Sequence, residues 1–357
     1  MSLLEQFLAI ARNTFLESIR QPVVFVIALA GTLFIALSNP FATFTLENDQ
    51  RMFIDIGLSS VFLAGVIGSA FVATNVLTRE IENRTVLTVV SKPVPRPIFI
   101  LGKYLGVSIC LLVLMSYLVL TFMIVEVHGS LETAASKYHM PVLVFGAAGA
   151  LIGVGAGIWC NYFYNWAFGA TTLMLMVPIA GLVYLLVLIF EREWATQSIA
   201  TDFNPQLWIA SGMLFMAVLI LTAIAIAAST RLNQLLTLLV TCGFFMLGLL
   251  SDWLFGRPLA NLTGGRANQT ELIDNGTEAV TSTAPVALEG ATLIEYWALW
   301  LAHTVVPNFQ VFWLADAVNQ GHPIPGQYVG VTLAYGVLLI VAALCVAVIL
   351  FQKREVG

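Results

Sequence analysis

The stretch that decides the architecture is TREIENRTVLTVVSKPVPRPIFILGKYLG, residues 78–106, which carries seven charged side chains and three prolines at alternate positions. Long apolar runs flank its charged part, at residues 53–77 and 104–126. Each run reaches the length of about 20 residues that crosses the hydrocarbon core of a bilayer. A charged connection between two such runs predicts that the chain leaves one membrane-spanning helix and enters the next.

The composition extends this prediction to the whole chain. Charged residues make up 10% of the 357 residues and hydrophobic residues 59%, with a mean hydropathy of +0.91. Soluble domains carry about 25% charged residues, so the chain is predicted to be an all-α polytopic membrane protein. Eight spans are expected, the first of them a retained span rather than a cleaved leader: 22–38, 53–77, 104–126, 140–161, 167–190, 207–229, 232–254 and 325–350.

The N-terminal residues 3–20 predict an amphipathic helix. Apolar side chains recur at helical spacing on one stripe, and charged side chains lie elsewhere. Such a helix is expected to lie in the membrane interface with its apolar face in lipid. The stripe consists of Leu4, Phe7, Leu8, Ala11, Phe15 and Ile19.

The basic residues predict the orientation of the spans. If both termini are cytoplasmic, ten of the fifteen Lys and Arg residues lie inside, against only five of the twenty Asp and Glu residues. Cytoplasmic loops of membrane proteins carry an excess of Lys and Arg. Cytoplasmic N- and C-termini are therefore expected.

The segment 255–324 is the one sizeable polar region and is expected outside. Its first part is rich in Gly, Thr and Asn, which is typical of a flexible loop. Residues 291–318 are rich in aromatic side chains, which favour the membrane interface. They are expected to form either an interfacial helix or a re-entrant hairpin.

Two spans in the middle of the chain are separated only by NYFYNW, residues 161–166, and are expected to form a tight hairpin. Gly149, Gly153 and Gly157 recur four residues apart in its first helix. Small residues let two helix backbones approach closely in lipid, so these glycines predict a helix-packing seam. A contact within the chain is favoured over a dimer face or a substrate groove.

The sequence contains no catalytic or metal-binding motif. HExxH and GxSxG are absent, and the cysteines, with no CxxC pair, are interpreted as packing thiols. GHPIPGQY has Gln327 and Tyr328 where a phosphate-binding loop needs Lys and Ser or Thr, so no ATP site is expected. The four cysteines are Cys110, Cys160, Cys242 and Cys345. The four histidines are scattered along the sequence, at His128, His139, His303 and His322.

Ionisable side chains inside spans would indicate an ion or proton path. Here Asp55, Glu126, Glu191 and Asp252 are all expected at or near outer ends of spans, where they reach water. This placement disfavours an ion-coupled carrier.

Residues 78–103 are interpreted as a cytoplasmic coupling loop. REIENRTVLTVV is compatible with a short helix that has Glu80 and Glu82 near its start, where the helix dipole favours acids. The prolines of KPVPRP end it, and Lys103 is expected to anchor the next span at the headgroups. Such a stiff, charged element can dock on a soluble partner, although a merely basic connection that obeys the orientation rule is an alternative.

The same stretch resembles the connection between the second and third spans of ABC-2 type transporter permeases. The similarity is to the branch that contains the nitrous-oxide-reductase maturation and gliding-motility permeases, many of which have Gly where this chain has Arg84. NTFLESIRQP near the N-terminus and the C-terminal region ending in FQKRE also resemble this family, while residues 140–190 resemble a hairpin added to its six-span core. The matching residues are Glu80, Glu82, Thr85, Lys92, Pro93, Val94, Arg96, Gly102 and Lys103.

The resemblance implies two permease chains, as a homodimer or with a sibling chain, working with two ATP-binding subunits in a prokaryotic inner membrane. ATP and Mg would be bound by the partner, membrane lipid would surround the permease, and no nucleic acid is expected. The chain would be a non-enzymatic subunit of an exporter; a mechanical or anchoring component driven by the same ATPase is the alternative. The expected contacts with the ATP-binding subunit are Glu80, Glu82, Thr85, Lys92, Pro93, Arg96 and Lys103, with Pro93, Pro95 and Pro97 keeping the loop stiff.

Overall fold

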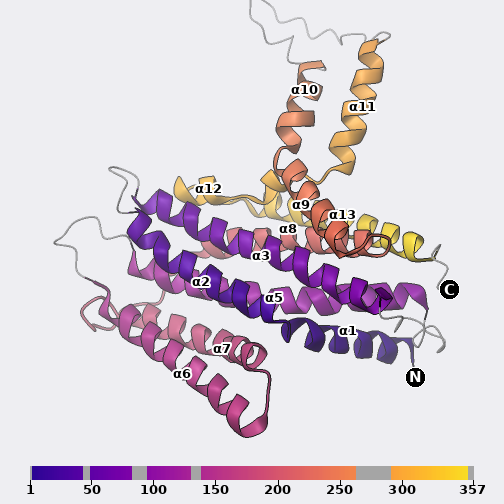
Figure 1. Ribbon diagram of the computed structural model, residues 1–357. Coiled ribbons are helices and arrows are strands. Elements are labelled where there is room, and N and C mark those ends of the chain that lie inside the picture. The colour runs from indigo at the N-terminus through magenta and orange to yellow at the C-terminus, as the bar shows by residue number, and fades with distance from the viewer. Residues whose placement is uncertain (1, 43–48, 83–94, 130–137, 263–290, 353–357) are drawn as a thin grey trace, which may run out of the picture. The chain divides into compact units, whose positions relative to one another are not determined.

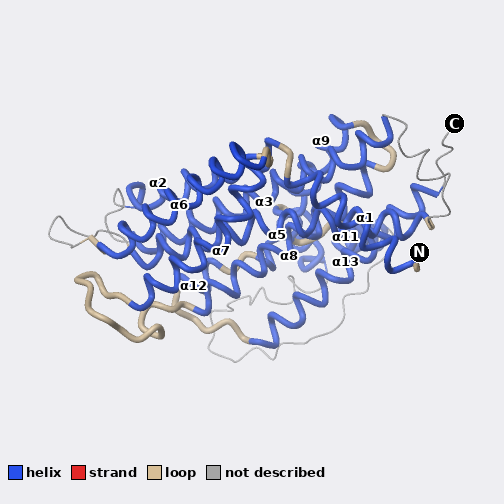
Figure 2. Tube along the Cα trace, turned by 90° about the horizontal axis from the view of Figure 1, so that it is seen from below, coloured by secondary structure: helices blue, strands red, loops and turns tan. Residues whose placement is uncertain are grey.

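A computed structural model describes residues 2–42, 49–82, 95–129, 138–262 and 291–352. Over these residues the chain is helical apart from short connections, and the only β-pairing is an isolated bridge between Phe190 and Thr196 (Figure 2). It divides into two compact units, Met1–Thr241 with Phe312–Gly357, and Cys242–Val311. The all-α prediction is confirmed for the described part of the chain.

The first unit contains the long helices. In Figure 1, α2, α3 and α5 run side by side, and α8 and α13 pack against them. Its helices are α1 (Leu3–Ile19), α2 (Pro22–Ala42), α3 (Asp49–Glu82), α5 (Arg96–His128), α6 (Met140–Tyr164), α7 (Phe168–Ile189), α8 (Pro205–Ser229), α12 (Ala315–Asn319) and α13 (Gly326–Gln352), and α9 (Gln234–Leu249) begins in it.

The prediction of a polytopic membrane protein is confirmed by seven helices of the described residues that are long and apolar enough to cross a bilayer. They are α2, α3, α5, α6, α7, α8 and α13. An eighth crossing results if α9 and the helical turns that follow it count as one broken span, since the two parts are bent by 57°.

The predicted seventh span, 232–254, is therefore not a straight helix. α9 ends at Leu249 and is followed by a π-helical turn, η1 (Asp252–Gly256), and by α10 (Arg257–Ala260). The side-chain amide of Gln310 donates to the carbonyl of Leu249 at 2.7 Å, which takes an acceptor that a continuing helix would use. The bend was not predictable from hydropathy, because Gln310 lies 61 residues away in the sequence.

The second unit also holds part of the predicted outer segment. Residues 257–260 are helical rather than part of a flexible loop, and most of the predicted loop lies outside the described residues. The aromatic-rich part forms α11 (Ala291–Val305) and the 3-10 turn η3 (Phe309–Phe312). α11 has 15 residues, fewer than a straight membrane-spanning helix needs.

The α6–α7 hairpin is held together by the three predicted seam glycines. Gly149, Gly153 and Gly157 are buried on one face of α6. A Cβ atom added to them would lie 2.7 Å from Val183, 2.3 Å from Met176 and 2.0 Å from Thr172, all on α7. The seam therefore joins two neighbouring helices of the same chain.

α1 is a well-defined helix that begins with a capping box between Ser2 and Glu5. The predicted stripe does not face lipid as a whole. Ala11 and Ile19 are buried, together with Thr14 and Ser18, which the stripe did not include, whereas Leu4 and Leu8 remain exposed. The buried face packs on α5, so α1 is in part a core helix of the first unit.

Candidate functional site

The ends of α3 and α5 flank the predicted coupling segment, and we call this end of the first unit the connection end. α3 runs without a break from Asp49 to Glu82, because no proline or glycine interrupts its last turns. Glu80 and Glu82 thus belong to the end of α3 and not to the start of a separate helix, so the dipole argument for them does not apply. Thr85, Lys92 and Pro93 lie outside the described residues.

The prediction of one loop over residues 78–103 is also wrong at its C-terminal side. α5 already begins at Arg96, so residues 96–103 are helical. Pro95 is the N-cap residue, with extended backbone angles, and Pro97 lies in the first turn, where a missing N–H costs no helical hydrogen bond. These two prolines start α5 and do not stiffen a loop.

Lys103 lies inside the helix bundle. Only 2% of its surface is exposed, and its ammonium group lies 5.6 Å from the centre of the Phe99 ring. An aromatic face attracts a cation at this distance. A side chain so deeply buried offers no surface to a partner subunit, so the structure gives Lys103 a packing role instead of the predicted contact.

Arg96 joins the start of α5 to the end of α13. Its guanidinium group donates a hydrogen bond to the carbonyl of Gln352, the last residue of α13. One turn further along, the rings of Phe99 and Phe351 are stacked with centroids 5.6 Å apart. A cation at the C-terminal end of a helix is favourable because it meets unpaired carbonyls and the negative end of the helix dipole.

Replacing Arg96 by glutamine is expected to loosen the end of α13. Loss of the charge-assisted bond should cost about 1 kcal/mol, which corresponds to a roughly fivefold gain in the exchange rate of the amides over 348–352. Hydrogen exchange measured by mass spectrometry tests this. Arg231→Gln, which changes an exposed arginine after α8, is the matched control, and equal exchange in both variants would contradict the capping role.

A buried polar link ties three further elements together near the connection end. Asn75 on α3 is 9% exposed. Its amide donates to Gln21, between α1 and α2, at 3.3 Å, and its carbonyl accepts from Gln234, at the start of α9, at 2.7 Å. Sequence reasoning did not single out Asn75, although a lone amide inside an apolar run was an available signal, because buried polar groups require partners.

Close packing of α1 on α5 depends on two glycines of α5. Gly102 and Gly106 are four residues apart, as in the predicted seam of α6. A Cβ atom at Gly102 would lie 2.8 Å from Ile10, and one at Gly106 would lie 2.6 Å from the carbonyl oxygen of Ala11. The family resemblance drew attention to Gly102 as a motif residue, whereas the structure gives it a contact with α1.

Several charged side chains that were predicted on the extracytoplasmic side lie at the opposite end of the first unit. Asp55 accepts a hydrogen bond from Asn319 at 2.8 Å, and Arg51 pairs with Asp316 at 3.3 Å. His139, just before α6, is buried, and this burial lowers its pKa below the usual value. Both Asp55 and Glu126 lie near this end of their helices, in agreement with the sequence interpretation.

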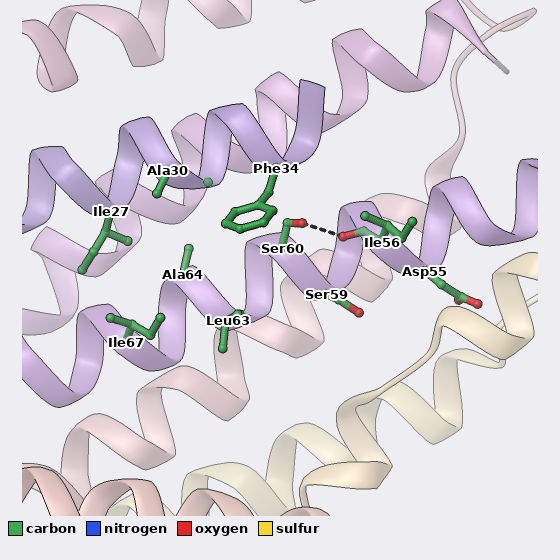
Figure 3. Close-up of a pocket in the computed structure, with 11 residues that line it drawn as sticks. Ile27, Ala30, Phe34, Asp55, Ile56, Ser59, Ser60, Leu63, Ala64 and Ile67 are labelled. Carbon is green, nitrogen blue, oxygen red and sulfur yellow. Dashed lines mark hydrogen bonds between the residues drawn. The ribbon is translucent and has the colours of Figure 1, made fainter. Parts of the chain in front are cut away.

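An apolar groove of about 330 Å³ lies between α2 and α3 (Figure 3). Ile27, Ala30 and Phe34 of α2 face the side chains of α3 across it. Ser59 and Asp55 provide polar groups toward one end, while the hydroxyl of Ser60 is bonded to the carbonyl of Ile56 at 2.7 Å. Apart from these groups at one end, the lining is apolar and suits a hydrocarbon chain.

Searches against protein-family models and against curated proteins find no match to this sequence. Within the described ranges, no group of three His, Cys, Asp or Glu side chains is arranged to hold a metal ion. The functional assignment therefore depends on the connection end and on the groove.

Proposed function

We propose that this chain is the membrane-spanning permease subunit of an ATP-driven exporter of the ABC-2 type. Two such chains would work with two ATP-binding subunits, which would carry ATP and Mg. The observation that carries the proposal is the linkage at the connection end. The two helices that flank the predicted coupling segment are tied there to α13 through Arg96 and to α9 and the α1–α2 junction through Asn75.

This linkage supports a mechanical role for the connection between Glu82 and Pro95. A partner that pressed on it would move α3 and α5, and a polar or aromatic contact would pass that movement to three other elements. α3 also forms one wall of the α2–α3 groove. Displacement of α3 would therefore change the width of a groove that can accept an amphiphilic cargo.

The distribution of charge supports a cytoplasmic position for the connection end. Arg231 follows α8 near this end, and Arg96 starts α5 there. Asp55 and Glu126 lie near the opposite ends of their helices. An excess of basic residues marks the cytoplasmic side, so this arrangement favours both termini on the cytoplasmic side.

Glu80→Ala combined with Glu82→Ala is expected to weaken association with the ATP-binding subunit. Removing two acidic partners from a charged interface typically costs about 2–5 kcal/mol, which is more than a tenfold loss of affinity. The measurement is co-purification of the ATP-binding subunit from membranes, followed by ATP turnover in proteoliposomes. Glu17→Ala, which removes an acidic side chain from α1, is the control for a general loss of negative charge.

Unchanged association and unchanged turnover in the double variant would refute the proposed contact. Stimulation of ATP turnover by an amphiphilic substrate separates transport from the alternative of a mechanical or anchoring component. An anchoring component would hydrolyse ATP with its partner but would show no such stimulation.

A further inference from the structure

A second cavity lies where α1 ends and α6 turns into α7. Its volume is about 550 Å³. One part of its wall is apolar, with Leu16, Ile19 and Met174, and the other part is polar. The polar part consists of Arg20, Asn161, Asn165 and Thr171.

Arg20 is the charged group of this cavity. It also lines a smaller adjoining cavity of about 280 Å³, which it shares with Glu17. Among the described residues, Arg20 makes no ion pair, and Glu17 does not come within ion-pairing distance of it. A guanidinium group without a carboxylate partner is suited to a phosphate, whose oxygens match its planar set of donors.

Thr171 provides a second and independent indication of a ligand. Only 5% of the residue is exposed, and it lines the cavity. In other spans the threonine hydroxyl donates to the carbonyl four residues earlier, as Thr32 and Thr222 do at 2.8 Å. The Thr171 hydroxyl makes no such bond to another described residue, so it is accessible from the cavity and can donate to a ligand there.

The backbone adds positive character to the same wall. α7 starts at Phe168, and its N-cap residue Ala167, which lines the cavity, provides no side-chain cap. The first N–H groups of a helix are unpaired and carry the positive end of the helix dipole, so they attract anions. The turn before α7 is fixed by Asn161, whose amide donates to the carbonyl of Trp166 at 2.6 Å.

The position of the cavity relative to the ends of the membrane spans indicates that a bound phosphate would come from a lipid. Candidate spans start at Pro22 and Phe168 and end at Tyr164, all close in sequence to residues that line the cavity. Aromatic side chains are exposed around the same turn, namely Trp159, Tyr162, Phe163, Tyr164 and Trp166. Span ends ringed by Trp and Tyr lie at headgroup level in a bilayer.

We propose that this cavity binds the phosphate group of an anionic membrane phospholipid. The Arg20 guanidinium and the Thr171 hydroxyl donate to the phosphate oxygens, with the start of α7 behind them. The apolar wall formed by Leu16, Ile19 and Met174 receives the beginning of an acyl chain. The site is separate from the α2–α3 groove and does not depend on the identity of the ATP-binding partner.

The test uses the full chain in detergent, titrated with short-chain phosphatidylglycerol and followed by native mass spectrometry. Arg20→Gln is expected to weaken binding about tenfold, the effect of losing one charge-assisted hydrogen bond. Arg12→Gln, an exposed arginine two turns earlier on α1, should change it by less than about twofold. Thr171→Val keeps the shape of the side chain and should weaken binding about threefold to fivefold.

Competition with glycerol phosphate distinguishes a lipid from a soluble phosphate. If the soluble compound displaces the lipid at equal concentration, the site recognises free phosphate and the lipid assignment is overturned. Equal binding by Arg20→Gln and Arg12→Gln would overturn the site itself. Thermal unfolding of each variant is measured in parallel, and Thr171→Val tests the same site if Arg20→Gln unfolds.

Discussion

Replacement of Gly106 by valine is expected to separate α1 from α5 and to destabilise the fold strongly. A Cβ atom at this position would lie 2.6 Å from the carbonyl oxygen of Ala11 and 2.6 Å from Cβ of Thr14. A backbone oxygen cannot rotate out of the way as the end of a flexible side chain can. Overpacking of a well-packed contact costs about 1–3 kcal/mol, and valine adds two further methyl groups to this clash.

The measurement for Gly106→Val is thermal unfolding in detergent, together with proteolysis at the α1–α2 junction. Gly212→Val on α8 is the matched control, because a Cβ atom there meets nothing within 4 Å. Both variants carry the same change in helix propensity, so the difference between them reports the contact with α1. If the two variants unfold at the same temperature, α1 does not need its close approach to α5.

Replacement of Phe122 by alanine is expected to have a similarly large effect at the α3–α5 contact. Phe122 is fully buried, and its ring stacks on Phe53 with centroids 5.6 Å apart. It fills the notch left by Gly57, where an added Cβ would lie 2.0 Å from the ring. Removing a buried phenylalanine costs about 3–5 kcal/mol in a protein core, and within a bilayer the lost packing contacts carry this cost.

A double-mutant cycle makes this prediction specific. Gly57→Ala should destabilise the natural chain, because its methyl group meets the Phe122 ring. In the Phe122→Ala background the same methyl group enters the vacated space and should be neutral or stabilising. If the changes in unfolding free energy of the two single variants add up to that of the double variant, the two residues do not share the contact. Phe163→Ala, which removes an exposed ring from α6, is the control for the loss of an aromatic side chain.

Much of the architecture could be predicted from hydropathy, because a span is a local property of about 20 consecutive residues. The expected spans 22–38 and 140–161 correspond to Pro22–Ala42 and Met140–Tyr164. The seam glycines could also be predicted, since their spacing lies within one helix. The burial of Lys103 beside the Phe99 ring could not be predicted, because it results from packing that the neighbouring sequence does not specify.

The candidate site could be predicted only in part for the same reason. The resemblance directed attention to residues 78–103, and Arg96 does lie at the connection end. Its partner Gln352, 256 residues away, and the bonds from Asn75 to Gln21 and Gln234 are long-range contacts that no local pattern encodes. The predicted break between span and loop at residue 78 is absent because nothing in the last turns of α3 opposes a helix.

The α6–α7 hairpin also has a consequence for biogenesis. Its helices pack on each other at three glycines and are joined by a turn of three residues. They can therefore form their mutual packing contacts before the rest of the chain has been made. Such a pair can leave the ribosome-bound insertion machinery as one module and enter the bilayer together. Substitutions that enlarge Gly153 or Gly157 would then be seen first as inefficient membrane integration during synthesis, ahead of any change in the finished protein.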